Sequence, residues 1–257
     1  MTYQTLGYDV AGGVATITLN RPEVMNGLNA LMRREIVEAI GAAGVEARAL
    51  VLTGAGRAFC SGQDLGEAQA VDPDFGRILR EEYEPMLRAL IEAPIPTLAA
   101  VNGAAAGAGA NLALAADVVI AARSAVFVQA FARIGLIPDA GGTWILPRSV
   151  GLARAMGAAL FAEPVPAETA AAWGMIWQAV PDEDFAATVA ARAAQLAAGP
   201  TLAYRLTRQA MREGLSRDLE AQLAVEAALQ GEAGRSHDFR EGVAAFLEKR
   251  PARYEGR

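Results

Sequence analysis

The sequence predicts an α/β core followed by a C-terminal subdomain built of helices alone. The chain has 257 residues, of which 53% are hydrophobic and 20% are charged, so it is long enough for one large core with an appended subdomain. Short apolar segments typical of buried strands alternate with helical segments as far as Val150. Beyond that residue the apolar side chains recur at helical spacing, which favours a separate helical region.

The first part of the chain is expected to hold the strands. Alternating and β-branched residues predict a hairpin over residues 3–10 and 14–19, with a glycine pair as its turn. Apolar residues at helical spacing predict one helix at 28–40 and another at 75–92, the second with a kink or break at Pro85. Further short apolar runs predict strands at 49–53, 97–101, 118–121 and 126–129.

The second part of the chain is expected to be helical. The predicted helices cover residues 151–161, 166–173, 183–198, 200–213, 216–232 and 238–248. We place the division between a core of residues 1–195, which carries the site, and a helical region of residues 196–257.

A loop of small residues forms the centre of the candidate site. The predicted strand at 97–101 leads into residues 102–110, which are almost all glycine and alanine, and a helix follows whose first polar side chain is Asn111. Small residues let the backbone approach a ligand closely, and the N–H groups at a helix start point outward as free donors. Such a segment favours an anion, or an oxygen atom that becomes one during a reaction. A tightly packed turn without a ligand is the alternative.

Two other segments carry candidate polar groups. Residues 57–65 form a second passage from strand to loop, with Gly62 in its middle. Residues 131–144 are expected to form a loop whose single carboxylate, Asp139, stands between a proline and a glycine pair. Apolar surroundings would raise the pKa of this carboxyl group toward the range that suits a base. A structural role for Asp139 as a helix N-cap is the alternative.

Composition excludes several classes of function. A net charge of −6 and a pI near 5.0 argue against nucleic-acid binding and against docking on an acidic membrane surface. The single cysteine, Cys60, and the single histidine, His237, leave no plausible zinc set, and one cysteine excludes an internal disulfide. A Ser-His-Asp triad would need His237, which stands among charged helix residues and is expected on a solvated helix face. The apolar runs are too short to span a bilayer and the start of the chain lacks a signal-peptide pattern, so we expect a soluble cytoplasmic protein without a metal.

Four motifs in fixed order resemble the enoyl-CoA hydratase/isomerase (crotonase) superfamily. They are residues 18–22, 56–65, 101–117 and 135–143, and with the C-terminal helices the resemblance covers nearly the whole chain. The resemblance implies a crotonase-like spiral of ββα units with an all-helical C-terminal subdomain that mediates trimerisation. It also implies an acyl-CoA substrate and an enolate held by two backbone N–H groups. We therefore expect a homotrimer or a dimer of trimers, with coenzyme A carried by the substrate and no further cofactor.

The same resemblance assigns roles to individual residues. The two N–H donors would belong to Gln63 and Ala108, and preorganised donors of this kind stabilise a developing oxyanion. Contacts to the substrate and its coenzyme A would come from Val24, Met25, Ala58, Gly62, Asp64, Leu65, Gly107, Phe131, Pro138 and Lys249. For three of these a structural role is the alternative. Asp64 has the character of a turn cap and Lys249 that of a solvated helix end, and Phe131 is alternatively a plain core residue.

Departures from the family pattern indicate the reaction. Hydratases that resemble this chain carry glutamates where Asn111 and Phe131 stand, and hydration needs one group to activate water and another to deliver a proton. With Asp139 as the remaining carboxylate and Asn111 as a polar positioner, the pattern favours a 1,3-proton shift. The amino-acid sequences of these loops closely resemble those of the isomerases that convert ring-1,2-epoxyphenylacetyl-CoA to oxepin-CoA in phenylacetate degradation. A Δ3-Δ2-enoyl-CoA isomerase of fatty-acid oxidation and a non-catalytic CoA-binding protein are the alternatives.

Overall fold

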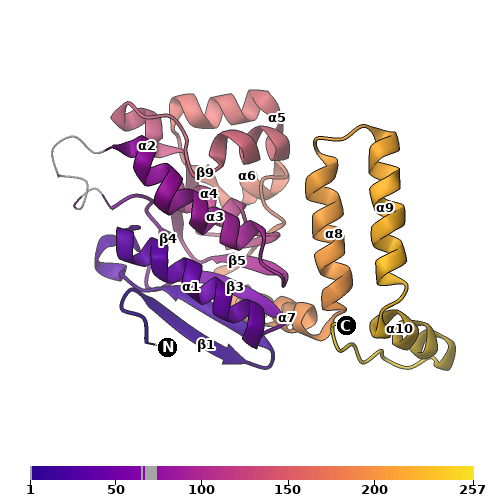
Figure 1. Ribbon diagram of the computed structural model, residues 1–257. Coiled ribbons are helices and arrows are strands. Elements are labelled where there is room, and N and C mark those ends of the chain that lie inside the picture. Colours follow the sequence, from indigo (N-terminus) through magenta and orange to yellow (C-terminus); the bar gives the residue numbers. More distant parts are fainter. Residues whose placement is uncertain (1, 65, 67–73) are drawn as a thin grey trace.

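The computed structural model describes residues 2–64, 66 and 74–257, which form two sheets surrounded by helices (Figure 1). A six-stranded sheet has the strand order β1-β2-β3-β5-β7-β10, and a four-stranded sheet has the order β4-β6-β8-β9. The strands of the larger sheet are β1 (Leu6–Ala11), β2 (Val14–Leu19), β3 (Ala49–Gly54), β5 (Thr97–Val101), β7 (Val118–Ala122) and β10 (Gln178–Val180). Those of the smaller sheet are β4 (Ala58–Cys60), β6 (Ala104–Ala106), β8 (Val126–Val128) and β9 (Val165–Pro166).

The larger sheet is covered on both faces. Only β1 and β2 pair antiparallel within it, and every other neighbouring pair is parallel. On β5, Ala99 packs into the main core while Leu98 and Ala100 pack against a smaller cluster with Ala193 of α7 (Asp182–Ala198). Alternate residues of a strand point to opposite faces, so a strand buried on both faces is a continuous apolar run. This explains why the polar groups of the site lie beyond the strand ends.

The helices that cover the main core are α1 (Ala30–Glu46), α2 (Phe75–Ile78), α3 (Glu84–Ile91), α4 (Ala108–Leu114), α5 (Gly142–Phe161) and α6 (Ala167–Ala172). In α1, the buried residues Met32, Ile36, Ala39, Ile40 and Ala43 recur at helical spacing, and the Asn29 side chain caps the helix by accepting from the Met32 amide. A π-helical turn, Leu79–Tyr83, joins α2 to α3, so the helix does not break at Pro85, which occupies the first turn of α3.

The remaining helices stand to one side of the sheets (Figure 1). They are α8 (Thr201–Gly214), α9 (Leu219–Ala233) and α10 (His237–Glu248). Asp117, which directly precedes β7, accepts hydrogen bonds from Arg208 at 2.7 Å and from Arg212 at 2.9 Å, so ion pairs join α8 to the core. The proposed division at residue 195 falls inside α7, which packs on the larger sheet.

The second half of the chain differs from the sequence prediction in two ways. A helix begins at Gly142, inside the segment expected to be a loop, and non-helical backbone at Gly151 interrupts it where the prediction began the helix. The glycine pair and Pro147 concealed the helical pattern before that point. Two short strands, β9 and β10, lie in a region expected to contain helices alone, because each needs only two or three residues to extend an existing sheet. Among the described residues, no helix is both long and apolar enough to cross a membrane.

Candidate active site

Two parallel strands bring two of the predicted loops together. β4 pairs with β6 through Ala58 and Ala104, so the segments that follow both strands leave the small sheet side by side. Gly62 has a φ of +91°, and a Cβ there would lie 2.8 Å from the Ala106 carbonyl oxygen and 3.3 Å from the Ala108 amide nitrogen. The close approach of these two segments therefore depends on glycine at position 62.

The backbone N–H groups of Gln63 and Ala108 take no part in the hydrogen bonds of the bridge to Leu28 and of helix α4, respectively. Leu28 bonds to the residues on either side of Gln63, since its amide donates to the Gly62 carbonyl at 2.7 Å and its carbonyl accepts from the Asp64 amide at 3.2 Å. Successive peptide groups of an extended chain point to opposite sides, so the Gln63 N–H faces away from Leu28. Ala108 is the first residue of α4, where a helical N–H has no partner within its own helix.

One cavity of about 200 Å³ joins these two amides to Asp139. Its lining also includes the predicted residues Gly62, Gly107 and Phe131. The other residues of the lining are Ser61, Phe75, Ile78, Leu79, Tyr83, Ala130, Arg133, Ile134 and Leu136. Within the described part of the chain, Asp139 is the one carboxylate in this lining. The site therefore combines one carboxylate with the residues of two candidate backbone donors in a mostly apolar enclosure.

Asp139 is not a helix cap. The N-cap of α5 is Gly141 and makes no side-chain cap hydrogen bond, whereas the Asp139 backbone carbonyl accepts from the Gly142 amide at 2.8 Å. The Oδ1 atom of Asp139 is buried and accepts no hydrogen bond from any residue that the structure describes. A buried carboxylate oxygen without a donor is energetically unfavourable, and such unsatisfied groups are often found at sites of chemistry.

Burial raises the pKa of the Asp139 carboxyl group to about 6, because the charged form loses hydration and a hydrogen bond from its own backbone amide offsets only part of that loss. A base must be deprotonated to accept a proton, so kcat/KM is expected to rise with pH and to level off above about pH 6. Measuring kcat/KM between pH 4.5 and 8.5 checks this prediction. A profile that is flat across this interval would contradict Asp139 as the base.

Asn111 lies behind the loop of Asp139 and outside the cavity lining. Its side chain is fully buried, donates to the Asp139 backbone carbonyl at 2.8 Å and accepts from the Gln129 side chain at 2.9 Å. Both functional groups of the Asn111 amide are thereby used within the protein. The structure gives Asn111 a positioning role for the Asp139 backbone, with Gln129 as a further member that the sequence did not indicate.

The residues assigned to coenzyme A are only partly gathered at the cavity. Val24 and Met25 are partly exposed, and the Met25 carbonyl accepts from the Ser61 amide, so both lie beside the loop of Gly62. Ala58 is 2% exposed within β4 and presents little surface to a ligand. Asp64 accepts from the Gly66 amide at 2.9 Å and pairs with Arg21 at 2.8 Å, which agrees with its alternative role as a turn cap.

Three further predicted residues lie in different places. Pro138 is half-buried and directly precedes Asp139. Leu65 lies outside the described residues. Lys249 directly follows α10, which lies below α9 at the opposite side of the molecule from α2, so Lys249 is far from the cavity of its own chain (Figure 1).

Aromatic residues divide between two adjoining cavities. Phe131 is buried and lines the cavity with Asp139, whereas Trp144 lines a neighbouring cavity of about 600 Å³ between α3 and α5. Asp139 and Tyr83 belong to the walls of both. Tyr83 was missed because the sequence showed a helix at this point and not the π-helical turn that directs its ring inward.

Cys60 and His237, which the sequence analysis did not assign to the site, do not line the cavity of Asp139. Cys60 is fully buried within β4, and burial raises its thiol pKa to about 12, so it stays a neutral thiol. His237 starts α10 on the surface. No cluster of metal-ligating side chains occurs among the residues that the structure describes.

Known proteins resemble the chain over its whole length. The sequence model described as enoyl-CoA hydratase/isomerase matches residues 9–257. A Rhodobacter capsulatus protein named "Probable enoyl-CoA hydratase" is 64% identical over 100% of both chains, and the 1,2-epoxyphenylacetyl-CoA isomerase of Escherichia coli is 49% identical over 96% of this chain and 97% of its own. The crystal structure of an enoyl-CoA hydratase from Bacillus anthracis superposes with a TM-score of 0.94 at 31% identity, covering 99% of this chain and 100% of the other.

Proposed function

Because the chain belongs to the enoyl-CoA hydratase/isomerase family, we propose that it is an acyl-CoA isomerase in which Asp139 alone moves the proton. The observation that carries this proposal is the single carboxylate in a cavity that also contains the Gln63 and Ala108 amides. Neither Asn111 nor Phe131 offers a second acid–base group. The Asn111 side-chain amide is hydrogen-bonded within the protein, and the Phe131 side chain is a hydrocarbon. This arrangement favours isomerisation over hydration, which requires two proton-transferring groups.

The proposed reaction is a proton transfer through an enolate. Asp139 accepts the proton from the carbon next to the thioester carbonyl, and the electron pair of that C–H bond moves onto the carbonyl oxygen. The Gln63 and Ala108 amides stabilise the resulting oxyanion, each contributing on the order of 10²–10³ in rate. Protonated Asp139 then returns the proton to the γ carbon, so that a 3-enoyl thioester becomes a 2-enoyl thioester and no external cofactor is consumed.

The ring-1,2-epoxide of phenylacetyl-CoA is the substrate that we favour. The relative at 49% identity is named for that reaction, and Phe131 supplies an aromatic wall to the cavity. In this case the enolate would form while the epoxide C–O bond and the ring bonds reorganise to the oxepin. A Δ3-Δ2-enoyl-CoA isomerase would use the same base and the same two amides.

The test supplies the purified protein separately with a 3-enoyl-CoA, a 2-enoyl-CoA and ring-1,2-epoxyphenylacetyl-CoA. Isomeric products are separated by liquid chromatography and identified by nuclear magnetic resonance, and hydration is detected by mass spectrometry as the gain of one water. We expect a 2-enoyl-CoA from the first, no 3-hydroxyacyl-CoA from the second, and oxepin-CoA from the third with the highest kcat/KM. Formation of 3-hydroxyacyl-CoA would instead assign hydration, the reaction in the name of the R. capsulatus relative. Binding of all three thioesters without turnover would indicate a non-catalytic CoA-binding protein.

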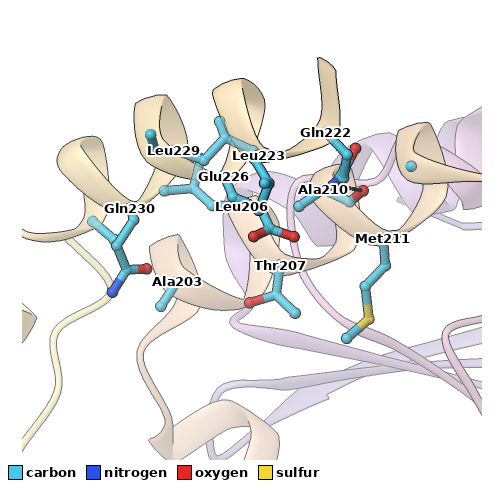
Figure 2. A pocket seen from close by; sticks show the side chains of 13 residues that line it. Ala203, Leu206, Thr207, Ala210, Met211, Gln222, Leu223, Glu226, Leu229 and Gln230 are labelled. Carbon is cyan, nitrogen blue, oxygen red and sulfur yellow. Dashed lines mark hydrogen bonds between the residues drawn. The ribbon is translucent and has the colours of Figure 1, made fainter. Parts of the chain in front are cut away.

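We also propose that the chain assembles as a homotrimer or as a dimer of trimers. Figure 2 shows the open groove between α8 and α9, where side chains such as Leu206 and Leu223 line a cavity of about 700 Å³. Large apolar side chains remain exposed on the C-terminal helices, which is typical of an interface. They are Met211, Leu215, Leu219, Leu223, Phe239, Val243, Phe246 and Leu247. Light scattering after size-exclusion chromatography is expected to give three or six times the 26.8 kDa chain mass, and a monomer would contradict the proposal.

A further inference from the structure

A buried polar cluster lies behind the segment that carries the Gln63 amide. Arg33, on α1, is 2% exposed, and its Nη2 lies 2.6 Å from Oε2 of Glu82. The same guanidinium stacks over the Tyr83 ring, 4.8 Å from its centroid. Glu82 and Tyr83 are neighbours in the π-helical turn, a rare conformation that is frequent at functional sites. We call Arg33, Gln63, Glu82 and Tyr83 the Arg33 cluster.

The Arg33 cluster holds the segment of Gln63 at two points. Nη1 of Arg33 donates to the Leu28 carbonyl at 2.7 Å, and that carbonyl also accepts from the Asp64 amide. The Oε1 atom of Gln63 accepts from Nη1 of Arg33 at 3.0 Å and from the Tyr83 hydroxyl at 2.5 Å. Two donors on one atom fix which way the Gln63 side-chain amide faces, because its NH₂ group has no acceptor capacity.

From these contacts we infer that the Arg33 cluster positions the Gln63 backbone amide for the enolate oxygen. The inference rests on the proposed function, since it assumes that this amide is an oxyanion donor. Gly62, just before Gln63, has no side chain with which to fix the segment. An oxyanion donor contributes most when its direction is set before the reaction begins. A charge-assisted cluster, in which Glu82 balances the buried charge of Arg33, supplies that rigidity.

Tyr83→Phe separates positioning from packing. The variant keeps the ring, its place in the cavity wall and its stacking with Arg33, but removes one of the two donors to Oε1 of Gln63. It also removes the hydroxyl that accepts a 3.4 Å hydrogen bond from Nη1 of Arg33. A looser donor loses part of its interaction with the transition state, whereas the substrate carbonyl in the ground state depends on it less. We expect kcat to fall about tenfold, less than the 10²–10³ typical for loss of a whole donor. KM is expected to change less than about twofold.

A spectroscopic measurement reports the donors directly. The carbonyl stretch of butyryl-CoA labelled with ¹³C at its thioester carbon is recorded by infrared difference spectroscopy, free and bound. Wild-type protein is expected to lower the stretching frequency on binding, and Tyr83→Phe is expected to lower it less. Gln63→Met removes Oε1, the acceptor of these hydrogen bonds, and is expected to give the same smaller shift of the carbonyl frequency. Tyr8→Phe is the matched control, because the Tyr8 hydroxyl donates to Glu46 at an exposed position outside the cavity lining.

The outcomes separate this inference from the proposed function. If Tyr83→Phe has the same kcat and the same carbonyl shift as the wild type, the positioning role is overturned. It is also overturned if kcat falls only in proportion to a loss of thermal stability while the carbonyl shift is unchanged. If Asp139→Asn is inactive while Tyr83→Phe behaves as wild type, the proposed function stands and the positioning role fails. If Asp139→Asn keeps full activity, the proposed function itself fails.

Discussion

Replacing Asp139 with asparagine is expected to lower kcat for the shift of a 3-enoyl-CoA to a 2-enoyl-CoA by about 10³-fold. The asparagine side chain has the same shape but cannot accept the proton, and no other carboxylate belongs to the described lining of the cavity. The two amide donors stay in place, so KM is expected to remain within about twofold.

The conjugated product is followed by its ultraviolet absorbance, and acyl-CoA binding is measured by calorimetry. Asp9→Asn, at an exposed position on β1, is the matched control for loss of one negative charge. Equal rates for wild type and Asp139→Asn would remove Asp139 as the base.

The same substitution is expected to stabilise the fold at neutral pH. The folded-state pKa of Asp139 is about 6, above the value near 3.9 of an unfolded chain, so the folded protein binds more protons between these values. The contribution of Asp139 to stability therefore falls as pH rises from about 4 to about 6 and stays low above that. A difference of about two pKa units corresponds to about 3 kcal/mol as an upper limit. Urea unfolding at pH 4.5 and pH 7.5 is expected to show the advantage of Asp139→Asn mainly at the higher pH.

The sequence predicted much of this site because its main components are local. The segments around Gly62, Gly107 and Asp139 could be identified from glycine positions and one isolated carboxylate, and the structure joins all three in one cavity. The N-cap alternative for Asp139 could not be decided, because it depends on whether the side chain turns toward α5 or into the cavity. The backbone at Asp139 is held by Asn111 through a hydrogen bond that spans 28 residues, and no local pattern reveals such a contact.

The features that the sequence could not predict are contacts between residues far apart in the chain. The Arg33 cluster joins α1, the Gln63 loop and the turn before α3, and nothing in the local pattern of Arg33 distinguishes it from a solvent-exposed helix residue. The short strands β9 and β10 have the same origin, because two or three residues carry no periodic signal and are recruited by a sheet already formed. Long apolar runs such as β5 and the spaced apolar residues of α1 were predictable, since burial alone selects them.

The second large effect is expected for Gly109→Ala, at the start of α4. A Cβ at this position would lie 2.7 Å from both Cβ and Sγ of Cys60, and closer still to the Cys60 carbonyl oxygen. These atoms are buried in β4, so α4 and β4 must move apart. We expect the free energy of unfolding to fall by about 3 kcal/mol, at the upper end of the range for overpacked cores. The displaced Ala108 amide is expected to lower kcat of the protein that remains folded by about 10²-fold.

Urea unfolding and kcat per folded molecule test this prediction, with Gly157→Ala as the control. Gly157 lies inside α5 with no atom within 4 Å of an added Cβ, so alanine there is expected to stabilise the protein by about 0.5–1 kcal/mol. A second substitution, Cys60→Ala, removes the contact with Sγ but leaves those with Cβ and the carbonyl oxygen. The double variant should therefore regain only part of the lost stability. Full recovery would mean that the thiol, and not the backbone of β4, limits the approach of α4 and fixes the position of the Ala108 amide.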